Sequence, residues 1–318
     1  MKMFEHGTHE ESGDPAGHPV LVVGCGFIGR NMVEGLSGRG HSVSALTLSE
    51  PVGEVHGAAS RVIIGDARDP DVLRDAMSGV RHVAWCAGGL MPREAEADPD
   101  RDRDLTLTPL ETLASLAPEF DGVSITYISS GGTVYGSHSV EPVSENDPTT
   151  PIGAYGRNKL LAEDLLVDSA AKAGFKVRIL RCSNVYGPNQ PSNRGQGAVA
   201  VFTERISSGE PIEIFGDGGA FRDYVHVDDV VRATRKLWDE GGPAVLNCGS
   251  GQAVSIIGLI EALEKSLGRT ARITRLPGRD FDVSGIVLDI GRITALIDFD
   301  PVDLATGLGV DFALAPND

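Results

Sequence analysis

The sequence predicts an α/β fold built on a doubly wound parallel sheet. Through residue 186, apolar β-rich segments alternate with helical segments, which is the pattern of a parallel sheet with helices on both faces. The first apolar segment ends in a glycine-rich turn, and several later ones end in polar residues. Ligands of such sheets bind at the carboxyl ends of the strands, so the functional groups are expected along that edge.

Six strands can be followed in order, because runs of Val, Ile, Leu and aromatic residues favour strands. They are expected in HPVLVVG (18–24), HSVSALTL (41–48), RVIIGD (61–66), VRHVAWCAG (80–88), GVSITYISS (122–130) and FKVRILRCSNVYG (175–187). Helices are expected after the glycine turn, over DPDVLRDAM (69–77) and over the amphipathic stretch 154–173. The acidic stretch EAEADPDRDRD (94–104) is expected to be an exposed loop.

The predicted division is a disordered tail over 1–18, a dinucleotide-binding domain over 19–186 and a smaller part over 187–318. In the last part, loops rich in Gly, Pro and Asn alternate with short helices. We expect it to be mainly substrate-binding, with some segments returning to the first domain. His6, His9 and His18 could bind metal, but a solvated tail explains them without one, so no metal is predicted.

Composition restricts the function. The net charge of −17 argues against a nucleic-acid partner, which needs a basic face, but a few arginines could still hold one phosphate group. No apolar run approaches the roughly 18 residues of a membrane span, and no signal-peptide core is evident at the N-terminus. The four cysteines are far apart and form no CxxC pair, which favours reduced thiols. A cytoplasmic protein without a membrane partner is expected.

The turn after the first strand has the spacing G-x-G-x-x-G, in the letters GCGFIG (24–29). Gly24 permits the tight turn, Gly26 lets the backbone approach a pyrophosphate, and Gly29 permits close helix packing. Phe27 and Ile28 open the helix, whose N-terminus faces the phosphate charge. This context predicts a dinucleotide cofactor, NAD or NADP, and a Rossmann-type fold.

The choice between NAD and NADP depends on the end of the second strand. An acidic residue there normally holds the adenosine ribose, whereas this chain has Thr47. Arg30, directly after the third glycine, is a candidate for the 2′-phosphate of NADP, although an exposed helix residue is an equal alternative. Asp66, at the end of the third strand, is placed to approach the adenine. These residues favour NADPH slightly.

Tyr155 and Lys159 are four residues apart at the start of a predicted helix, so they share one face. Tyrosine, with a pKa of ~10, needs help to exchange a proton near neutrality. An ammonium roughly 5 Å away contributes about 3 kcal/mol at an effective dielectric of ~20, which lowers that pKa. Tyr155 is therefore predicted to act as acid or base on a sugar hydroxyl or ketone, and Lys159 also to hold the nicotinamide ribose. The alternative is an ordinary exposed helix pair.

A cluster of hydroxyls follows the fifth strand, in SSGGT (129–133). Ser130 and Thr133 are candidates for a second hydrogen bond to the reacting oxygen. A serine-rich turn that satisfies only its own backbone is the alternative.

With these motifs together, the sequence resembles the extended short-chain dehydrogenase/reductase family, in particular its nucleotide-sugar epimerases, dehydratases and 4-ketoreductases. The resemblance runs from about residue 19 to 310 and rests on GCGFIG, GDARD, SSGGTVYG, YGRNK, RCSNVYGP, GDGGAFRDYVHVDD and PGRDFD, in the family's order. It implies that Asn184 contacts the substrate and that Arg222 and Arg279 hold the pyrophosphate of a nucleotide sugar, as suits guanidinium groups. Ion pairs with Asp223 or Asp282 are the structural alternative. A homodimer through two long helices is also typical of such proteins.

Two departures from the family's pattern guide the choice of reaction. Gly131 stands where the family usually has its catalytic Ser or Thr, and GGT stands where dehydratases have an Asp-Glu pair, which disfavours dehydration. The missing ribose anchor at Thr47 favours a reductase of a nucleotide-linked 4-keto-6-deoxysugar, which must release its cofactor. A 4-epimerase with bound NAD is the alternative, and a non-catalytic dinucleotide sensor is a remote one.

Overall fold

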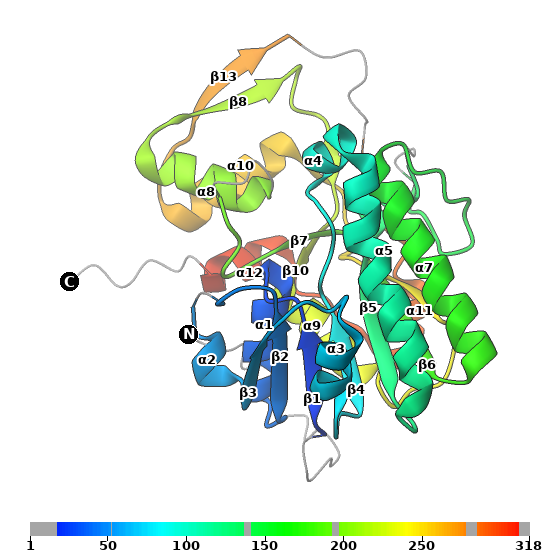
Figure 1. The fold of residues 1–318 in the computed structure, drawn as a ribbon. Coiled ribbons are helices and arrows are strands. Elements are labelled where there is room, and N and C mark those ends of the chain that lie inside the picture. Colours follow the sequence, from blue (N-terminus) through cyan, green and yellow to red (C-terminus); the bar gives the residue numbers. More distant parts are fainter. Residues whose placement is uncertain (1–17, 52, 137–140, 193–196, 278–284, 312–318) are drawn as a thin grey trace.

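The computed structural model describes residues 18–51, 53–136, 141–192, 197–277 and 285–311. Its centre is a seven-stranded sheet of order β11-β6-β5-β4-β1-β2-β3, in which every neighbouring pair is parallel (Figure 1). The strands are β1 (Val20–Val23), β2 (Val43–Thr47), β3 (Arg61–Ile64), β4 (His82–Trp85), β5 (Ser124–Ser130), β6 (Lys176–Cys182) and β11 (Val245–Cys248). The predicted doubly wound α/β fold is confirmed.

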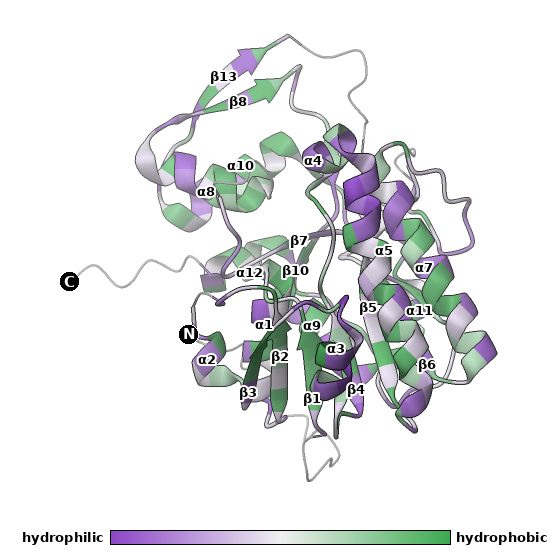
Figure 2. Ribbon diagram, in the orientation of Figure 1, coloured by the Kyte–Doolittle hydropathy of each residue, from purple (hydrophilic) through white to green (hydrophobic). Residues whose placement is uncertain are grey.

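Helices cover both faces of the sheet. Successive side chains of a strand point to opposite faces, and the strands carry apolar side chains on both, so each face must be covered. Leu21 and Val23 face a core shared with α3 (Pro70–Met77), α5 (Pro99–Leu116) and α7 (Ala154–Ala173). Val20 and Val22 face a second core with α1 (Phe27–Gly38), α9 (Val227–Lys236) and α11 (Gly291–Ile297). Figure 2 shows the central strands as hydrophobic, whereas polar residues gather on the outer helices.

The strand order reverses between β1 and β4. From β1 the sheet grows through β2 and β3 in one direction, and through β4, β5, β6 and β11 in the other. The turns after β1 and β4 therefore diverge, and a crevice opens at the carboxyl ends of the strands, where such folds bind their ligands.

Most of the C-terminal part lies over those carboxyl ends (Figure 1), whereas its segments α9, β11 and α11 return to the sheet and to one of its helix layers. It has three two-stranded pairs, β7–β10, β9–β12 and β8–β13, and its own core with α8, α10 and α12. The bounds are β7 (Asn184–Tyr186), β8 (Pro211–Phe215), β9 (Phe221–Arg222), β10 (Tyr224–His226), β12 (Val254–Ser255), β13 (Arg272–Leu276), α8 (Ala198–Ser208), α10 (Ile256–Leu267) and α12 (Leu304–Asp311). Shorter helices are α2 (Val55–Ala58), α4 (Pro92–Ala97), α6 (Gly131–Val134) and η1 (Ala117–Glu119).

The segment 94–104 is mostly exposed, as expected, but the expectation of a loop was wrong. The segment forms the end of α4 and the start of α5. Asp98 accepts a hydrogen bond from the backbone of Arg101, and a proline follows it at the first helical position, so the Asp-Pro pair starts a helix. Acidic residues in the first turn suit the positive end of the helix dipole. Asp102 within this turn is fully buried.

The sixth expected strand is divided in two, because Ser183 separates β6 from β7. The edge strand β11 was not predicted, since VLNC is too short to be distinguished from other apolar runs. The predictions for residues 1–17, Arg279 and Asp282 lie outside the described residues. In the described part of the chain, no helix is long and apolar enough to cross a membrane.

Candidate functional site

One cavity of about 570 Å³ lies at the carboxyl ends of the strands. The glycine turn and the residues after β4, β5 and β6 form one wall, and the C-terminal part forms the other. The lining includes Gly26, Phe27, Ile28, Gly88, Gly89, Leu90, Met91, Ser129, Ser130, Tyr155, Lys159, Cys182, Asn184, Tyr186, Gln190, Arg222, Tyr224 and Ile256. The cavity thus brings the predicted dinucleotide turn and the predicted reacting pair together.

The glycine turn has the geometry that a pyrophosphate requires. Gly24 has φ +89°, and a Cβ at Gly29 would lie 1.7 Å from the Gly24 carbonyl oxygen, so both positions need glycine. A Cβ at Gly26 would meet no atom within 4 Å, which leaves this backbone open to the cavity. Helix α1 begins at Phe27 without a side-chain cap, so the N–H groups of its first turn can bind an anion. A nicotinamide dinucleotide fits these residues.

The three residues predicted at the adenosine end have other partners in the protein. Arg30 donates to the carbonyl oxygen of Asn189 at 3.3 Å, and the Thr47 hydroxyl donates to the Ser49 carbonyl at 3.1 Å. The Asp66 carboxylate accepts from the Arg68 guanidinium at 2.7 Å, and this hydrogen bond lowers the pKa of Asp66. Their roles toward a cofactor stay predictions.

Tyr155 and Lys159 lie on the first turns of α7 and line the same cavity. The buried Lys159 ammonium donates to the Ile128 carbonyl oxygen at 3.0 Å. It lies 4.7 Å from the centre of the Tyr127 ring and 5.9 Å from that of the Tyr155 ring. Helix α7 and the end of β5 therefore hold Lys159 between two aromatic rings.

Burial dominates the electrostatics of this pair. It lowers the pKa of Lys159 to about 8, although several nearby anionic or ionisable groups act in the opposite direction. Burial raises the pKa of Tyr155 to about 12, and the Asp102 carboxylate adds to this effect. The expected lowering of the Tyr155 pKa is therefore wrong for the protein alone, and Tyr155 is a protonated hydroxyl at neutral pH.

The two hydroxyl candidates after β5 occupy different places. Ser130 lines the main cavity with Tyr155. Thr133 bonds weakly to the Ser130 carbonyl oxygen at 3.3 Å and lines an adjoining recess instead. A Cβ at Gly131 would lie 2.7 Å from Leu288 Cδ1, so the space that a side chain would need is filled.

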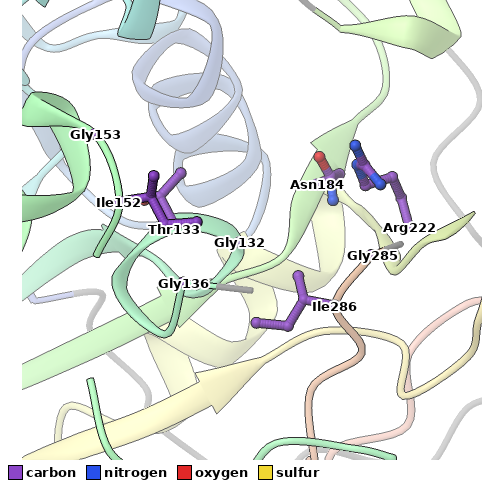
Figure 3. A pocket seen from close by; sticks show the side chains of 9 residues that line it. All are labelled: Gly132, Thr133, Gly136, Ile152, Gly153, Asn184, Arg222, Gly285 and Ile286. Carbon is purple, nitrogen blue, oxygen red and sulfur yellow. The ribbon is translucent and has the colours of Figure 1, made fainter. Parts of the chain in front are cut away.

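The adjoining recess has a volume of about 210 Å³ and shares two residues with the main cavity, Asn184 and Arg222. Figure 3 shows Thr133 and Ile152 on one side of this recess and Asn184 and Arg222 on the other. The Asn184 side chain donates to the Asp223 carbonyl oxygen at 3.1 Å, and Arg222 donates to the Phe221 carbonyl at 2.6 Å.

The proposed ion pair between Arg222 and Asp223 is not what holds this segment. The Asp223 carboxylate accepts from the Ser250 N–H at 2.7 Å, from the Ser250 hydroxyl at 2.8 Å and from the Leu288 N–H at 3.1 Å. Arg222 therefore stays directed at the cavity and the recess, both of which it lines.

A buried polar network beneath the site was missed by sequence reasoning. Glu163, one turn after Lys159, accepts from Arg181 at 2.7 Å and from the Ser129 hydroxyl. Arg181 also donates to the Tyr135 hydroxyl at 3.0 Å, which donates to Asn247 at 2.7 Å. The spacing of Glu163 from Lys159 was the available signal, since residues four apart share a helix face. The network ties α7 to β5, β6 and β11.

Within the described ranges, no group of three or more His, Cys, Asp or Glu side chains is placed to hold a metal ion. The four cysteines are free thiols. Burial raises the pKa of Cys25 to about 11 and raises that of Cys86 further, so both are protonated at neutral pH.

Residues 20–249 match the model of the NAD dependent epimerase/dehydratase family. Over 311 residues the chain is 32% identical to the dTDP-4-dehydro-6-deoxy-D-allose reductase of Streptomyces bikiniensis, covering 92% of this chain and 94% of the relative. It is 37% identical over 178 residues to the dTDP-4-dehydro-6-deoxyglucose reductase of Escherichia coli, a match that spans 56% of each protein.

The fold is similar to that of solved epimerases. The UDP-glucose 4-epimerase of Thermotoga maritima, solved with UDP-glucose, superposes with a TM-score of 0.86 at 31% identity, covering 93% of this chain and 97% of the other. The UDP-glucose 4-epimerase of Thermus thermophilus in complex with NAD gives 0.83 at 28% identity, covering 93% and 98%.

Proposed function

Because the chain belongs to the NAD dependent epimerase/dehydratase family, we propose that it reduces the 4-keto group of a nucleotide-linked 6-deoxysugar with a nicotinamide cofactor. The observation that carries the proposal is the single cavity that joins the glycine turn, Tyr155, Lys159 and Arg222. The residues proposed to bind the cofactor and the arginine proposed to bind the diphosphate of the sugar therefore lie around the same cavity as Tyr155, the proposed acid.

The residues have distinct tasks in this reaction. A bound reduced nicotinamide supplies the hydride that the carbonyl carbon accepts, and it is oxidised in the step. Tyr155 donates its hydroxyl proton to the carbonyl oxygen, and Ser130 donates a hydrogen bond to the same oxygen. Lys159 holds the ribose near the nicotinamide, while Arg222 binds the diphosphate. Thr133 and Asn184 contact the sugar from the recess, and Arg279 stays a predicted diphosphate ligand.

Reduction is placed first because Thr47 ends β2, where an enzyme that retains its NAD usually has an acidic residue to hold the adenosine ribose. A reductase must release its oxidised cofactor after each turnover, so the loss of this anchor suits a reductase better than an epimerase. The matches along the chain include a reductase and UDP-glucose 4-epimerases alike.

NADPH is the proposed cofactor. Thr47 provides no carboxylate for the ribose hydroxyls, and Arg30 on the first turn of α1 supplies a cation for a 2′-phosphate. We expect a lower KM for NADPH than for NADH in the wild type. Thr47→Asp should reverse that preference, because a carboxylate binds the ribose hydroxyls and repels the phosphate. A lower KM for NADH in the wild type would contradict the assignment to NADPH.

The decisive experiment measures absorbance at the reduced-nicotinamide band, with a dTDP-4-dehydro-6-deoxysugar and NADPH. We expect loss of signal in proportion to the sugar consumed. Tyr155→Phe should abolish nearly all turnover while NADPH still binds, as followed by cofactor fluorescence. No turnover in the wild type, with equal NADPH binding by the wild type and the phenylalanine variant, would instead support a non-catalytic dinucleotide sensor.

A 4-epimerase is the second candidate, because the fold superposes closely on UDP-glucose 4-epimerases. It would interconvert UDP-glucose and UDP-galactose with NAD and without net loss of cofactor signal. Activity in that assay, without reduction of any 4-keto sugar, would replace the first proposal. A cytoplasmic homodimer, formed through the two long helices α5 and α7, stays a prediction. Light scattering, which measures the molar mass in solution, tests the dimer.

A further inference from the structure

Asp102 is a buried carboxylate beside the reacting site. Its side chain is fully buried on the first turn of α5. One oxygen accepts from the Leu90 N–H at 2.6 Å and the other from the Asn158 amide at 2.7 Å. Both oxygens therefore face N–H donors, which is the pattern that an ionised carboxylate satisfies.

The two partners belong to different segments beside the reacting site. Leu90 lies in the segment 88–91 after β4, which lines the cavity, and Asn158 precedes Lys159 on α7. The backbone approaches closely here, since a Cβ at Gly89 would lie 2.2 Å from an Asp102 oxygen. Asp102 thus clamps the wall after β4 to the helix that carries Tyr155.

The same carboxylate places a negative charge in the surroundings of Tyr155. Four ionisable groups influence this tyrosine or lie beside it, and each comes from a different element or turn: Asp102 from α5, Cys182 from β6, Tyr127 from β5 and Lys159 from α7 itself. A fixed anion in a water-poor site disfavours a second anion nearby. It therefore opposes the tyrosinate and favours the protonated hydroxyl.

We propose that Asp102 is a positioning residue of the reacting site, which holds the segment after β4 against α7 and whose buried charge adds to the effect of burial in keeping Tyr155 in its acid form. The benefit to reduction rests on the proposed function. The clamp rests on the two hydrogen bonds of Asp102, and the role of the charge rests on the effect of Asp102 on the Tyr155 pKa.

Asp102→Asn separates the charge from the clamp. The asparagine keeps an oxygen for Leu90, and its amide can donate to Asn158 once that side chain turns. Asp100→Asn is the matched control, because Asp100 is an exposed residue on the same first turn. Two readouts are needed: the pH profile of turnover with NADPH, and a tyrosinate absorbance titration of each protein against its Tyr155→Phe counterpart, which requires no substrate.

For Asp102→Asn we expect the Tyr155 titration to move to lower pH by about half a unit to one unit. The alkaline limit of turnover should move in the same direction, because Lys159, with a pKa of about 8, loses its charge first and Asp102 also raises the pKa of Lys159. Asp100→Asn should match the wild type. If the Asp102→Asn titration coincides with the wild type, the role of the charge is refuted whatever the substrate. A shifted titration in a protein that reduces no 4-keto sugar would support this inference and refute the proposed function.

The clamp has its own test. Asp102→Ala and Asn158→Ala should each raise the KM for sugar at least about tenfold, and Asp102→Asn should restore most of the loss, because it retains the hydrogen bonds. Unchanged KM values in Asn158→Ala, which keeps Asp102 and its bond to Leu90, would refute the clamp even if Asp102→Ala did not fold.

Discussion

Gly131→Ser restores the residue type that the family usually has at this position, yet we expect it to damage the protein. A Cβ there would lie 2.7 Å from Leu288 Cδ1 and 2.9 Å from the Arg181 carbonyl oxygen. Leu288 is fully buried, and its backbone N–H is bonded to Asp223. Neither neighbour can therefore move away at low cost.

The size of the effect follows from the contact distances. Non-bonded carbon atoms prefer about 3.5–4.0 Å, so the new Cβ approaches Leu288 by roughly 1 Å too much. Forcing an extra atom into such a core costs about 1–3 kcal/mol. Leu288→Ala alone should cost about 2–5 kcal/mol. The double variant should lose less stability than the sum of the losses in the two single variants, because the shortened side chain at position 288 leaves room for the serine.

Urea unfolding of the two single variants, the double variant and the wild type measures this coupling. Gly132→Ser is the control, because a Cβ at the neighbouring glycine meets no atom within 4 Å, and its stability should stay within about 0.5 kcal/mol of the wild type. Turnover should not rise in Gly131→Ser, since Ser130 already lines the cavity. A Gly131→Ser protein as stable as the wild type, with higher turnover, would refute the reasoning.

Two further predictions concern stability. Glu163→Gln should lower the free energy of unfolding by about 3–5 kcal/mol, because it leaves the buried Arg181 without its charge partner. The control is Asp164→Asn, at an exposed neighbouring residue, which should change the free energy of unfolding little. Equal losses in the two variants would contradict the role of the ion pair. Burial lowers the pKa of His82, which stacks on Trp238, from 6.5 to about 4. Between these two pKa values the unfolded chain binds a proton that the folded protein does not. The contribution of His82 to the free energy of unfolding is therefore complete above pH 6.5 and is about 2 kcal/mol lower at pH 5. His82→Phe should flatten that decline in urea titrations at several pH values, and an unchanged slope would refute it.

The periodicity of apolar residues was sufficient to predict the sheet and its main helix. Six expected strands correspond to β1–β6, and the helix expected over 154–173 matches α7. Except in β3, which is an edge strand, their side chains are buried on one or both faces, so burial imposes the period of each element on the sequence. The strand β11 was missed because four residues carry too little of that signal.

The acidic segment shows why composition misled the prediction. Charged residues were taken as a sign of an exposed loop. Most of them are exposed, but they lie on helices, Asp102 is buried, and the Glu96 carboxylate accepts the Ala154 N–H at 2.9 Å. Both carboxylates satisfy donors at the beginning of α7. These two contacts join residues 58 and 56 positions apart, so no local pattern could indicate them.

The hydroxyl candidates could not be separated by sequence for a similar reason. Ser130 and Thr133 are equally plausible by spacing, and only the turn into α6 sends one to the main cavity and the other to the recess. Leu288, far along the chain, decides that Gly131 cannot take their place.

The inward face of α7 carries an argument about function that does not depend on a substrate. Asn158, Lys159 and Glu163 are all buried on it. Apolar side chains of similar volume would often stabilise such a helix as well or better, because buried charges lose their hydration. Lys159 and Glu163 instead bond to Ile128 and Ser129, which line the cavity. Asn158 bonds to Asp102, whose other oxygen holds Leu90 of the cavity wall. The helix is therefore built to hold a site in one geometry, at some cost in stability, and the wall of that site is where a carbonyl would meet Tyr155.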